Sequence, residues 1–579
     1  MLKLATVLFI LLIAGTVPGA EAKMYIVDDD GFAQYDSINE AVLAAGDGDT
    51  LYVKPGIYKE HILLDKSLTI MPLRGEEGSI FLEYDGNPIG IKVQADGCVI
   101  EGLTITNFTG PGIYVNSDGN DIRDNLFIND LHAVFLNSSS QNTIEDNLAR
   151  RCLCGIVLQN SAKNTIKNNQ AEDGVYNANR LISAAILLHS SDNNTITGNS
   201  AARWHRGIVL HVQSNSNLLE DNLVSDGVYG FWMNDSCEDN EIKRCRFANT
   251  TNAIELRVCS GNLIHDNQLK DIDHGIRILT SPGNLIRNNQ LDDIDHGIWI
   301  SDSSANVLEE NALTDVVLGL YVDGDSVDSF QNQIAESNTM DGKPILYYYD
   351  RSGVRVGGRE CAQLTLAYCD NFTVQENVIT NDALFLYGSR DNLIRNNDIS
   401  NCYGMYIHDS SHNIIEGNLA CKNRFSGIFL VDSSSNRIDE NTVSQNNKNG
   451  ILLSGSNANQ IRENVIGSNL DKGIGLISSN ENEIVENVIV NNSLGISIKE
   501  SRANEVYHNN LIDNLEQASD DGSDNSWDRG PLTGGNHWSD HICTGDPCYD
   551  RPRMIGEETA DNYPFQSRDG WPLPGPKHT

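Results

Sequence analysis

The sequence predicts an all-β fold, a single parallel β-helix with coils of about 22 residues. Three observations predict it. The motif Asn-x-[Ile/Leu/Val]-x-x-Asn recurs with a usual step of 21 to 23 residues. Between motifs, apolar residues alternate with other residues, as in Gly275-Ile-Arg-Ile278, which is the period-two pattern of a strand. Asn and Gly, which tolerate the positive φ of tight turns, stand at the corners.

The N-terminal residues predict a leader followed by a cap. Residues 1–22 combine Lys3, an apolar run from Leu8 to Leu12 and small residues before a cleavage site, the pattern of a signal peptide. We therefore expect a secreted or cell-surface protein, either extracellular or periplasmic. Ser37 and Glu40 form a capping box that opens a predicted short helix over residues 38–45, whose apolar side chains cover the first coil.

The coils are expected to fill residues 23–515 as one rod. We expect the recurring Asn amides to form a ladder in which each side chain bonds the next coil. Residues 323–371 break the 22-residue step and are interpreted as longer coils of the same rod. Residues 516–579 lose the register and predict an irregular C-terminal cap. The motif starts at Asn120, Asn142, Asn164, Asn194, Asn217, Asn262, Asn284, Asn306, Asn392, Asn413, Asn436, Asn459, Asn482 and Asn504.

The charge of the chain limits its partners. With 80 Asp and Glu against 41 Lys and Arg, the formal net charge is −39. Nucleic acids and anionic membranes are disfavoured, because both are bound through basic surfaces. After the leader no segment approaches about 18 consecutive apolar residues, so no transmembrane segment is expected.

Stacked coils turn equivalent sequence positions into columns on the outer face. From about Arg203 to Asp323 these columns gather aromatic, basic and acidic side chains. In the coils at Gly450, Gly473 and Gly495 the same columns carry no aromatic, His, Arg or acidic side chain. Aromatic rings pack against sugar rings, and Arg, Asn and Asp bond hydroxyl groups, so we predict a carbohydrate-binding face. The predicted substrate-binding residues are His211, Tyr229, Trp232, Arg257, Arg277, Trp299, Tyr321 and Asp323.

Two successive coils carry the same sequence, Asp-Ile-Asp-His-Gly-Ile, at residues 271–276 and 293–298. Stacking should place Asp273 over Asp295 and His274 over His296. Carboxylates one coil apart, near 5 Å, can act as an acid and base pair, so these four residues are the candidate catalytic groups. The alternative is a duplicated coil whose Asp and His side chains only solvate a turn.

The 12 Cys residues predict disulfides if the chain is exported. Cys237 and Cys259 hold the same coil position and are within bridging reach, and Cys543 and Cys548 form a second predicted pair. Cys361 with Cys369 and Cys402 with Cys421 are weaker candidates.

Candidate metal ligands are few. His537 and His541, which lie near Cys543 and Cys548 in the tail, form one weak set, and the stacked His274 and His296 could supply two more ligands. These histidines make copper a candidate cofactor. Calcium is considered as a bridge between the acidic rod and a polyuronate.

Several segments resemble one family. These are residues 44–53 (Ala-Ala-Gly-Asp-Gly-Asp-Thr-Leu-Tyr-Val), 67–70 (Ser-Leu-Thr-Ile), 338–349, 536–540 (Asn-His-Trp-Ser-Asp) and 561–564 (Asp-Asn-Tyr-Pro), together with the Asn/Gly coils. They resemble the NosD-like and CASH-type β-helix proteins of archaea and bacteria. The resemblance implies a right-handed, pectin-lyase-like solenoid. The CASH name implies carbohydrate binding or sugar hydrolysis, and the NosD name implies copper delivery to a nitrous-oxide reductase.

Three functions remain open. The first is a secreted or cell-surface β-helix that binds carbohydrate; whether it also processes it, as a polysaccharide lyase, epimerase or glycoside hydrolase, is left open by the sequence. The acidic exterior favours a neutral or amino-sugar glycan over a polyuronate. The second is a non-enzymatic structural rod, such as a surface-layer or adhesin-like protein that self-associates. The third is a NosD-like periplasmic copper-binding protein.

Overall fold

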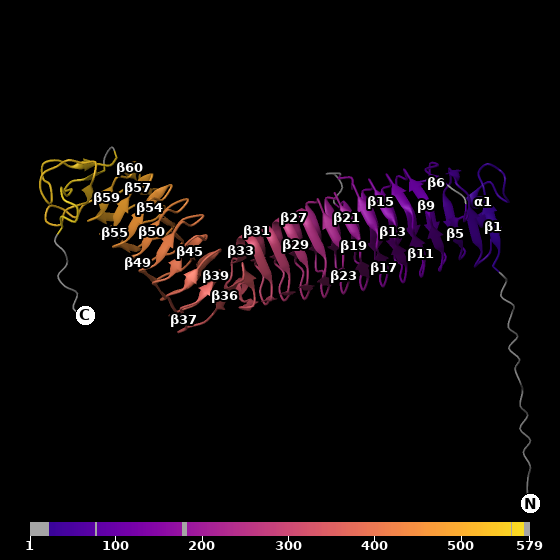
Figure 1. Cartoon of the computed structure of the whole chain (residues 1–579), viewed down its shortest axis with the longest axis horizontal. Helices are drawn as coiled ribbons and strands as arrows, with labels where there is room; N and C mark the ends of the chain where they lie inside the picture. The colour runs from indigo at the N-terminus through magenta and orange to yellow at the C-terminus, as the bar shows by residue number, and fades with distance from the viewer. Residues whose placement is uncertain (1–21, 76–77, 177–181, 557–558, 572–579) are drawn as a thin grey trace, which may run out of the picture.

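The computed structural model describes residues 22–75, 78–176, 182–556 and 559–571. Figure 1 shows an elongated rod of short strands, as the sequence predicts. The described residues contain one α-helix, α1 (Ile38–Ala44), and one 3-10 turn, η1 (Val327–Phe330). No helix among them is long and apolar enough to cross a membrane. The leader predicted for residues 1–22 falls, except for its last residue, outside the described ranges.

Most coils consist of three short strands, such as β11 (Asp121–Arg123), β12 (Leu126–Ile128) and β13 (His132–Asn137). The second and third strands of the first-segment coils belong to one sheet, which we call the wide sheet, and in the four coils before the elbow they merge into one strand of 12 residues. The coil of β26 (Glu241–Lys243) and β27 (Arg246–Arg257) stacks on that of β28 (Leu263–His265) and β29 (Gln268–Leu279). The pairing is parallel and in register, so like residues lie over like residues. Ile242, Ile264 and Ile286 form one such column and are fully buried. A thin core of stacked aliphatic side chains follows.

Both Asn residues of each motif form ladders, one on each side of the short strand. The Asn262 side-chain amide donates to Asn284 Oδ1 at 3.1 Å, and that of Asn267 donates to Asn289 Oδ1 at 2.9 Å. The same acceptors also receive the backbone N–H groups of Asn262 and Asn267. The predicted ladder is confirmed, and the structure adds a second one five residues further along each coil.

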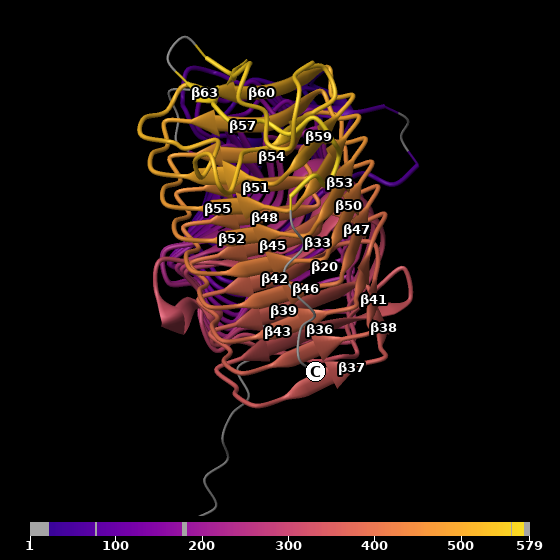
Figure 2. The same ribbon diagram turned by 90° about the vertical axis from the view of Figure 1, so that its left-hand side faces the viewer.

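Corresponding strands of the second half also stack in columns, as Figure 2 shows for β42 (Ala383–Tyr387), β45 (Gly404–His408) and β48 (Ile428–Val431). The first coil is covered by α1. Its N-cap is Ser37, whose side chain accepts the Glu40 backbone N–H at 3.4 Å, which confirms the Ser37 half of the predicted capping box. The Glu60 carboxylate accepts the next two free N–H groups, those of Ile38 and Asn39.

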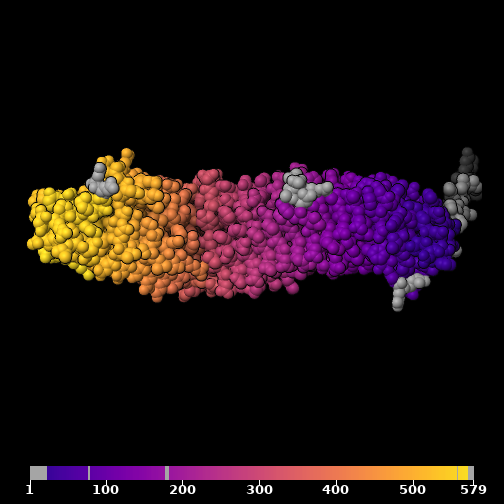
Figure 3. All heavy atoms as spheres, turned by 90° about the horizontal axis from the view of Figure 1, so that it is seen from above, coloured from indigo at the N-terminus to yellow at the C-terminus, as the bar shows by residue number. Residues whose placement is uncertain are grey.

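The rod bends where the sequence loses its step. Figure 1 shows an elbow between β33 (Ala312–Asp323) and β36 (Lys343–Tyr349), while Figure 3 shows a straight, narrow outline from above. At the elbow β35 (Thr339–Met340) pairs with β36 in antiparallel fashion, and β36 then starts a new parallel ladder with β39 (Gln363–Ala367). The buried core divides there into two large clusters. The predicted longer coils are therefore corrected: the break between two solenoid segments lies within residues 324–342, and residues 343–371 already form parallel coils of the second segment, with a step of 18 residues that is shorter than 22.

Side chains of the second segment replace the missing backbone partners of β33. Asp382 Oδ2 accepts the N–H groups of Gly319 and Leu320 at 2.9 and 3.3 Å, and Gln363 Nε2 donates to the Leu320 carbonyl at 2.9 Å. Asp382 is fully buried, and desolvation raises its pKa to about 7 despite these two donors. Its other oxygen has no hydrogen-bond partner among the described residues.

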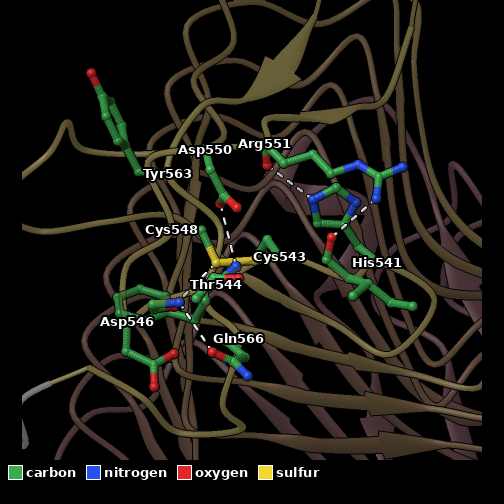
Figure 4. Close-up of a disulfide and its surroundings, with 12 residues drawn as sticks. His541, Cys543, Thr544, Asp546, Cys548, Asp550, Arg551, Tyr563 and Gln566 are labelled. Carbon is green, nitrogen blue, oxygen red and sulfur yellow. Dashed lines mark hydrogen bonds between the residues drawn. A yellow bond between two sulfur atoms is a disulfide. The ribbon is translucent and has the colours of Figure 1, made fainter.

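The ladder continues past residue 515 into the cap. β60 (Glu516–Asp520) pairs with β57 (Leu494–Lys499), and β61 (His537–Trp538) pairs with β59 (Asn510–Ile512). The boundary between solenoid and cap at residue 515 stays a prediction. Figure 4 shows the predicted Cys543–Cys548 disulfide in this cap, with Cα atoms 6.0 Å apart.

The remaining ten cysteines are free and buried. This corrects the predicted Cys237–Cys259 bridge and the weaker Cys361–Cys369 and Cys402–Cys421 candidates. The stacked thiols of Cys237 and Cys259 contact each other through a hydrogen bond and not a disulfide, and each also lies against a carbonyl of its own coil. Cys237 Sγ lies 3.3 Å from the Asn234 carbonyl and Cys259 Sγ 3.1 Å from that of Arg257.

Replacing a buried ladder residue is expected to destabilise the rod. Asn289→Ala removes the acceptor of the Asn267 backbone N–H and of one bond of the Asn267 side-chain amide, together with a donor to the Ile264 carbonyl, which should cost about 2–4 kcal/mol of unfolding free energy. Gln290→Ala removes an exposed amide at the next position and should cost less than about 0.5 kcal/mol. Urea unfolding measures both, and equal losses would contradict the ladder's role.

The elbow should be more stable in mild acid. With a folded pKa of about 7 against an ordinary value of 3.8, the folded chain binds the Asp382 proton more tightly than the unfolded chain. Stability is then lost as the pH rises through about 7, on the order of 2–4 kcal/mol between about pH 5 and pH 8. Asp382→Asn keeps an oxygen for the two N–H donors and should flatten this dependence. Urea unfolding at both pH values tests it, and a variant with the wild-type slope would overturn it.

Candidate functional site

The candidate site lies on the outer face of the wide sheet in the first segment. Its strands pair in register throughout. Their side chains form three neighbouring columns, and we call the following members of these columns the strip: Trp232, Glu255, Arg277, Trp299 and Tyr321 in the centre; Arg206, Tyr229, Asn252, His274 and His296 on one side; His211, Asn234, Arg257 and Asp323 on the other. Val209 and Leu318 occupy the ends of the first two columns, and Leu279 and Ser301 separate Arg257 from Asp323 in the third. The six strands are β22 (Arg206–His211), β25 (Tyr229–Asn234), β27, β29, β31 (Gln290–Ser301) and β33.

A buried carboxylate organises the middle of the strip. The Glu255 side chain is 0% exposed, although it points to the outer face. It pairs with Arg277, whose Nη1 lies 2.8 Å from Glu255 Oε2, and with Arg257 Nε. Arg277 Nη1 also donates to Asn252 Oδ1 at 3.0 Å. Because two guanidinium groups compensate one buried charge, the ion pairs hold both arginines in fixed positions.

Aromatic rings flank this ion-pair cluster on both sides. Arg277 lies over the Trp299 ring at 4.9 Å, and Arg206 lies over Trp232 at 4.7 Å. Trp299 Nε1 donates to Asp323 Oδ1 at 3.1 Å, and its ring packs edge-on against Tyr321. These contacts fix the rings in a half-buried position, so they present flat apolar surfaces between charged groups.

The two stacked histidines lie where the sequence predicts. The rings of His274 and His296 are 4.7 Å apart. Burial, with His296 and Arg277 nearby, lowers the pKa of His274. The neutral imidazole is therefore the main form at neutral pH, and it can accept or donate one hydrogen bond.

The carboxyl pair in contact is a different one from the predicted pair. Asp271 and Asp293 hydrogen-bond each other, and this contact raises the pKa of Asp293. Both occupy a corner with positive φ, 54° and 57°, and are exposed to solvent. Asp273 and Asp295 are exposed near His274, where their charge favours its protonation. Their assignment as catalytic groups stays a prediction.

The structure adds five residues to the predicted set. Arg206, Asn234, Asn252 and Glu255 belong to the strip, and His189 lies beside it, its ring 5.5 Å from that of His211. His211 Nδ1 in turn lies 3.2 Å from an Asp235 carboxylate oxygen. Alignment of the coils in the sequence places Glu255 between Trp232 and Arg277 in one column. The sequence alone does not indicate that two arginines form ion pairs with this carboxylate.

Residues suited to a metal centre do not converge. No group of three or more His, Cys, Asp or Glu side chains in the described ranges could hold a metal ion. In the tail, Cys543 and Cys548 are joined in a disulfide, and a His541 ring nitrogen lies 3.0 Å from the Arg551 carbonyl (Figure 4). His537 likewise contacts the Phe565 carbonyl. The proposed ligand set at His537 and His541 is therefore not assembled, because its donors have other partners.

Sequence comparison identifies the family. The profile described as "Periplasmic copper-binding protein (NosD)" matches residues 75–255 and 336–543, about two thirds of the chain. The chain belongs to the NosD family. A second profile, "Right handed beta helix region", matches residues 235–361 of this NosD-family protein, in agreement with the predicted hand. None of the curated proteins matches the chain.

Several solved structures resemble the NosD-family chain in fold. They include a PL6 family polysaccharide lyase from Pseudopedobacter saltans, 15% identical with a TM-score of 0.42, covering 55% of this chain and 92% of that one. A DFA-IIIase from Arthrobacter chlorophenolicus A6 is 15% identical with a TM-score of 0.43, covering 55% and 99%. A GH87 alpha-1,3-glucanase from Streptomyces thermodiastaticus is 9% identical with a TM-score of 0.42, covering 52% and 65%. These likenesses concern the solenoid fold alone.

Removing the buried carboxylate should disorder the strip. Glu255→Ala leaves Arg277, with a side chain 17% exposed, without its ionic partner, and breaking a buried pair in this way costs about 3–5 kcal/mol. Asp292→Ala breaks the exposed pair with Lys270 and should cost less than about 1 kcal/mol. For both variants, hydrogen exchange measures the local stability of β27 and β29, and urea unfolding measures the global free energy of unfolding. Similar losses in the two variants would contradict the organising role of Glu255.

Proposed function

We propose that this NosD-family protein acts outside the cytoplasm and binds a glycan along the strip. One observation carries the proposal: half-buried aromatic rings alternate with fixed hydrogen-bonding groups over six in-register strands. Sugar rings present apolar faces and a rim of hydroxyl groups, which such an alternation matches. Successive coils are about 4.8 Å apart, so a chain of sugars that lies along the rod axis contacts several coils.

The charge of the rod narrows the glycan class. A protein of net charge −39 repels polyuronates and sulfated chains. Neutral and amino-sugar polymers meet no such barrier. The strip itself offers Arg206, Arg257 and Arg277 for hydroxyl or acyl oxygens, and Asp323 for donors.

Binding is proposed rather than bond cleavage. The carboxyls in mutual contact, Asp271 and Asp293, lie at an exposed corner and not within the strip. Lyase, epimerase or hydrolase activity at Asp273, His274, Asp295 and His296 is tested by the same glycans, through release of reducing ends or unsaturated products.

Copper is the competing assignment, favoured by the description of the family profile. The described residues do not fit it, because His274 and His296 supply two adjacent imidazoles without a third ligand nearby. The proposal therefore contains no copper step. Calcium has no assembled site in those ranges either.

Glycan binding should depend on the two tryptophans. We expect Trp232→Ala and Trp299→Ala each to weaken binding by about tenfold or more, because each removes a central aromatic platform. Phe135→Ala is the matched control, since Phe135 is a half-buried aromatic residue on the same sheet outside the strip. A glycan array of neutral, amino-sugar and acidic polymers, followed by calorimetry, measures the effect.

The array also separates the alternatives. Wild-type protein that binds no glycan would overturn the proposal. This result would favour a structural rod, and sedimentation analysis would then detect its self-association. Equal losses in the control and the tryptophan variants would also contradict it.

A further inference from the structure

A second site lies at the elbow, between the two solenoid segments. A pocket of about 280 Å³ opens there, near the lower end of the range for small-molecule sites. The first segment supplies Tyr321 and Asp323 from β33, with the turn that follows, and the second supplies Tyr387 from β42 and Tyr406 from β45. The pocket therefore exists only because the ladder breaks and the two segments meet at an angle.

The walls of the pocket are aromatic. Phe330 and Tyr387 have ring centroids 5.1 Å apart, and those of Tyr387 and Tyr406 are 6.1 Å apart. The rings meet at 39° and 58°, so they do not stack on one another as a closed layer. With Tyr321 opposite, they surround a space with the electron-rich surfaces that attract cations.

Besides Ser301 and the His408 imidazole, the polar lining consists of carboxylates. Asp302, Asp323 and Asp325 all border the pocket. Asp323 is held by the Trp299 indole N–H, and Asp302 Oδ1 accepts the Asp325 backbone N–H at 3.0 Å. Across the residues that the structure describes, none of the three carboxylates forms an ion pair with Lys, Arg or His. No Lys or Arg of the described ranges lines the pocket, so His408 is the one basic side chain in its lining beside these three carboxylates.

A buried hydroxyl group also lines the pocket without a partner. Tyr387 is 4% exposed, and its hydroxyl oxygen makes no hydrogen bond of acceptable geometry in the described part of the chain. It lies against the hydroxyl of Tyr321. A buried hydroxyl without a partner costs free energy that a bound donor or acceptor recovers.

These features select the class of ligand. A bare metal ion is disfavoured, because the three carboxylates do not converge into a metal-binding group. A neutral ligand would leave the carboxylates uncompensated. An ammonium group carried on a small organic body satisfies both the aromatic walls and the acidic rim.

We propose that the elbow pocket of Tyr321, Phe330, Tyr387 and Tyr406, bordered by Asp302, Asp323 and Asp325, binds an organic ammonium ion. The ammonium group has two sources, an amino sugar of a glycan or a small free amine, and the two share the same recognition chemistry. The pocket shares Tyr321 and Asp323 with the end of the strip, but Phe330, Tyr387, Tyr406, Asp302 and Asp325 lie outside it, so the inference goes beyond glycan binding by the strip.

Calorimetry on the full chain tests the pocket directly. The probes are tetramethylammonium chloride and glucosamine, with N-acetylglucosamine and glucose as neutral counterparts, at about pH 6, where the amine is protonated. We expect at least one ammonium probe to bind at least tenfold more tightly than both neutral sugars. Binding of glucosamine alone identifies the amino-sugar source, and binding of tetramethylammonium identifies a free quaternary or small amine.

Three variants locate the site. Tyr406→Leu removes a wall and Asp323→Asn removes a charge, and each should weaken ammonium binding about tenfold. Tyr403→Leu is the matched control, because Tyr403 is a half-buried tyrosine nearby that stacks on Phe425 and does not line the pocket. Trp232→Ala should leave ammonium binding unchanged, so loss of glycan binding in that variant is read separately.

The proposal is overturned if the wild type binds neither ammonium probe or binds the neutral sugars equally well. It is also overturned if Tyr406→Leu and Asp323→Asn, both shown to be folded by circular dichroism, keep full affinity. If either variant fails to fold, the selectivity of the wild type for ammonium over neutral probes still decides the question.

Discussion

The whole molecule depends on in-register stacking of one coil on the next. Parallel pairing satisfies the backbone of each strand, but the corners between strands leave N–H and carbonyl groups inside a narrow rod. The two Asn ladders satisfy them, since each amide accepts the N–H of the coil before it and donates to a carbonyl of another coil. Burying an amide costs little folding free energy when all its N–H and carbonyl groups are hydrogen-bonded, but it costs much more when one of them is left without a partner. The ladders therefore fix the register, and the register fixes the surface.

A fixed register gives the strip its character. Outward residues one coil apart are direct neighbours, so identical charges along a column would repel each other strongly. The central column instead runs from an indole to a carboxylate, a guanidinium, an indole and a phenol. Each charge thus has an aromatic ring or an opposite charge beside it. The rod keeps its acidic excess elsewhere, and the strip is the place where cationic side chains are held still.

Much of this arrangement could be predicted from the sequence. Because the period is close to 22 residues, residues that align between repeats also lie beside each other in the structure. The columns, the helix over residues 38–44 and the Cys543–Cys548 bridge follow from local patterns. The loss of the 22-residue step marks the region of the elbow, but the contacts that close it could not be predicted, since Asp382 and Gln363 reach β33 from about 40 to 60 residues away. The contact of Asp271 with Asp293 depends on a left-handed corner that Asp does not reveal by itself. The thiols of Cys237 and Cys259 are close in register, but proximity does not decide their oxidation.

The division of the core at the elbow bears on how the chain is made. Coils contact mainly their immediate neighbours, so a solenoid can assemble in the order of synthesis, with its first segment complete before its second has emerged. The last backbone groups of that first segment wait for Asp382, which arrives some 60 residues later. Until then the first segment ends in an open β-edge, the kind of surface that recruits other strands. The interval between residue 320 and residue 382 is thus the stage of biosynthesis at which this protein most needs shielding from other copies of itself.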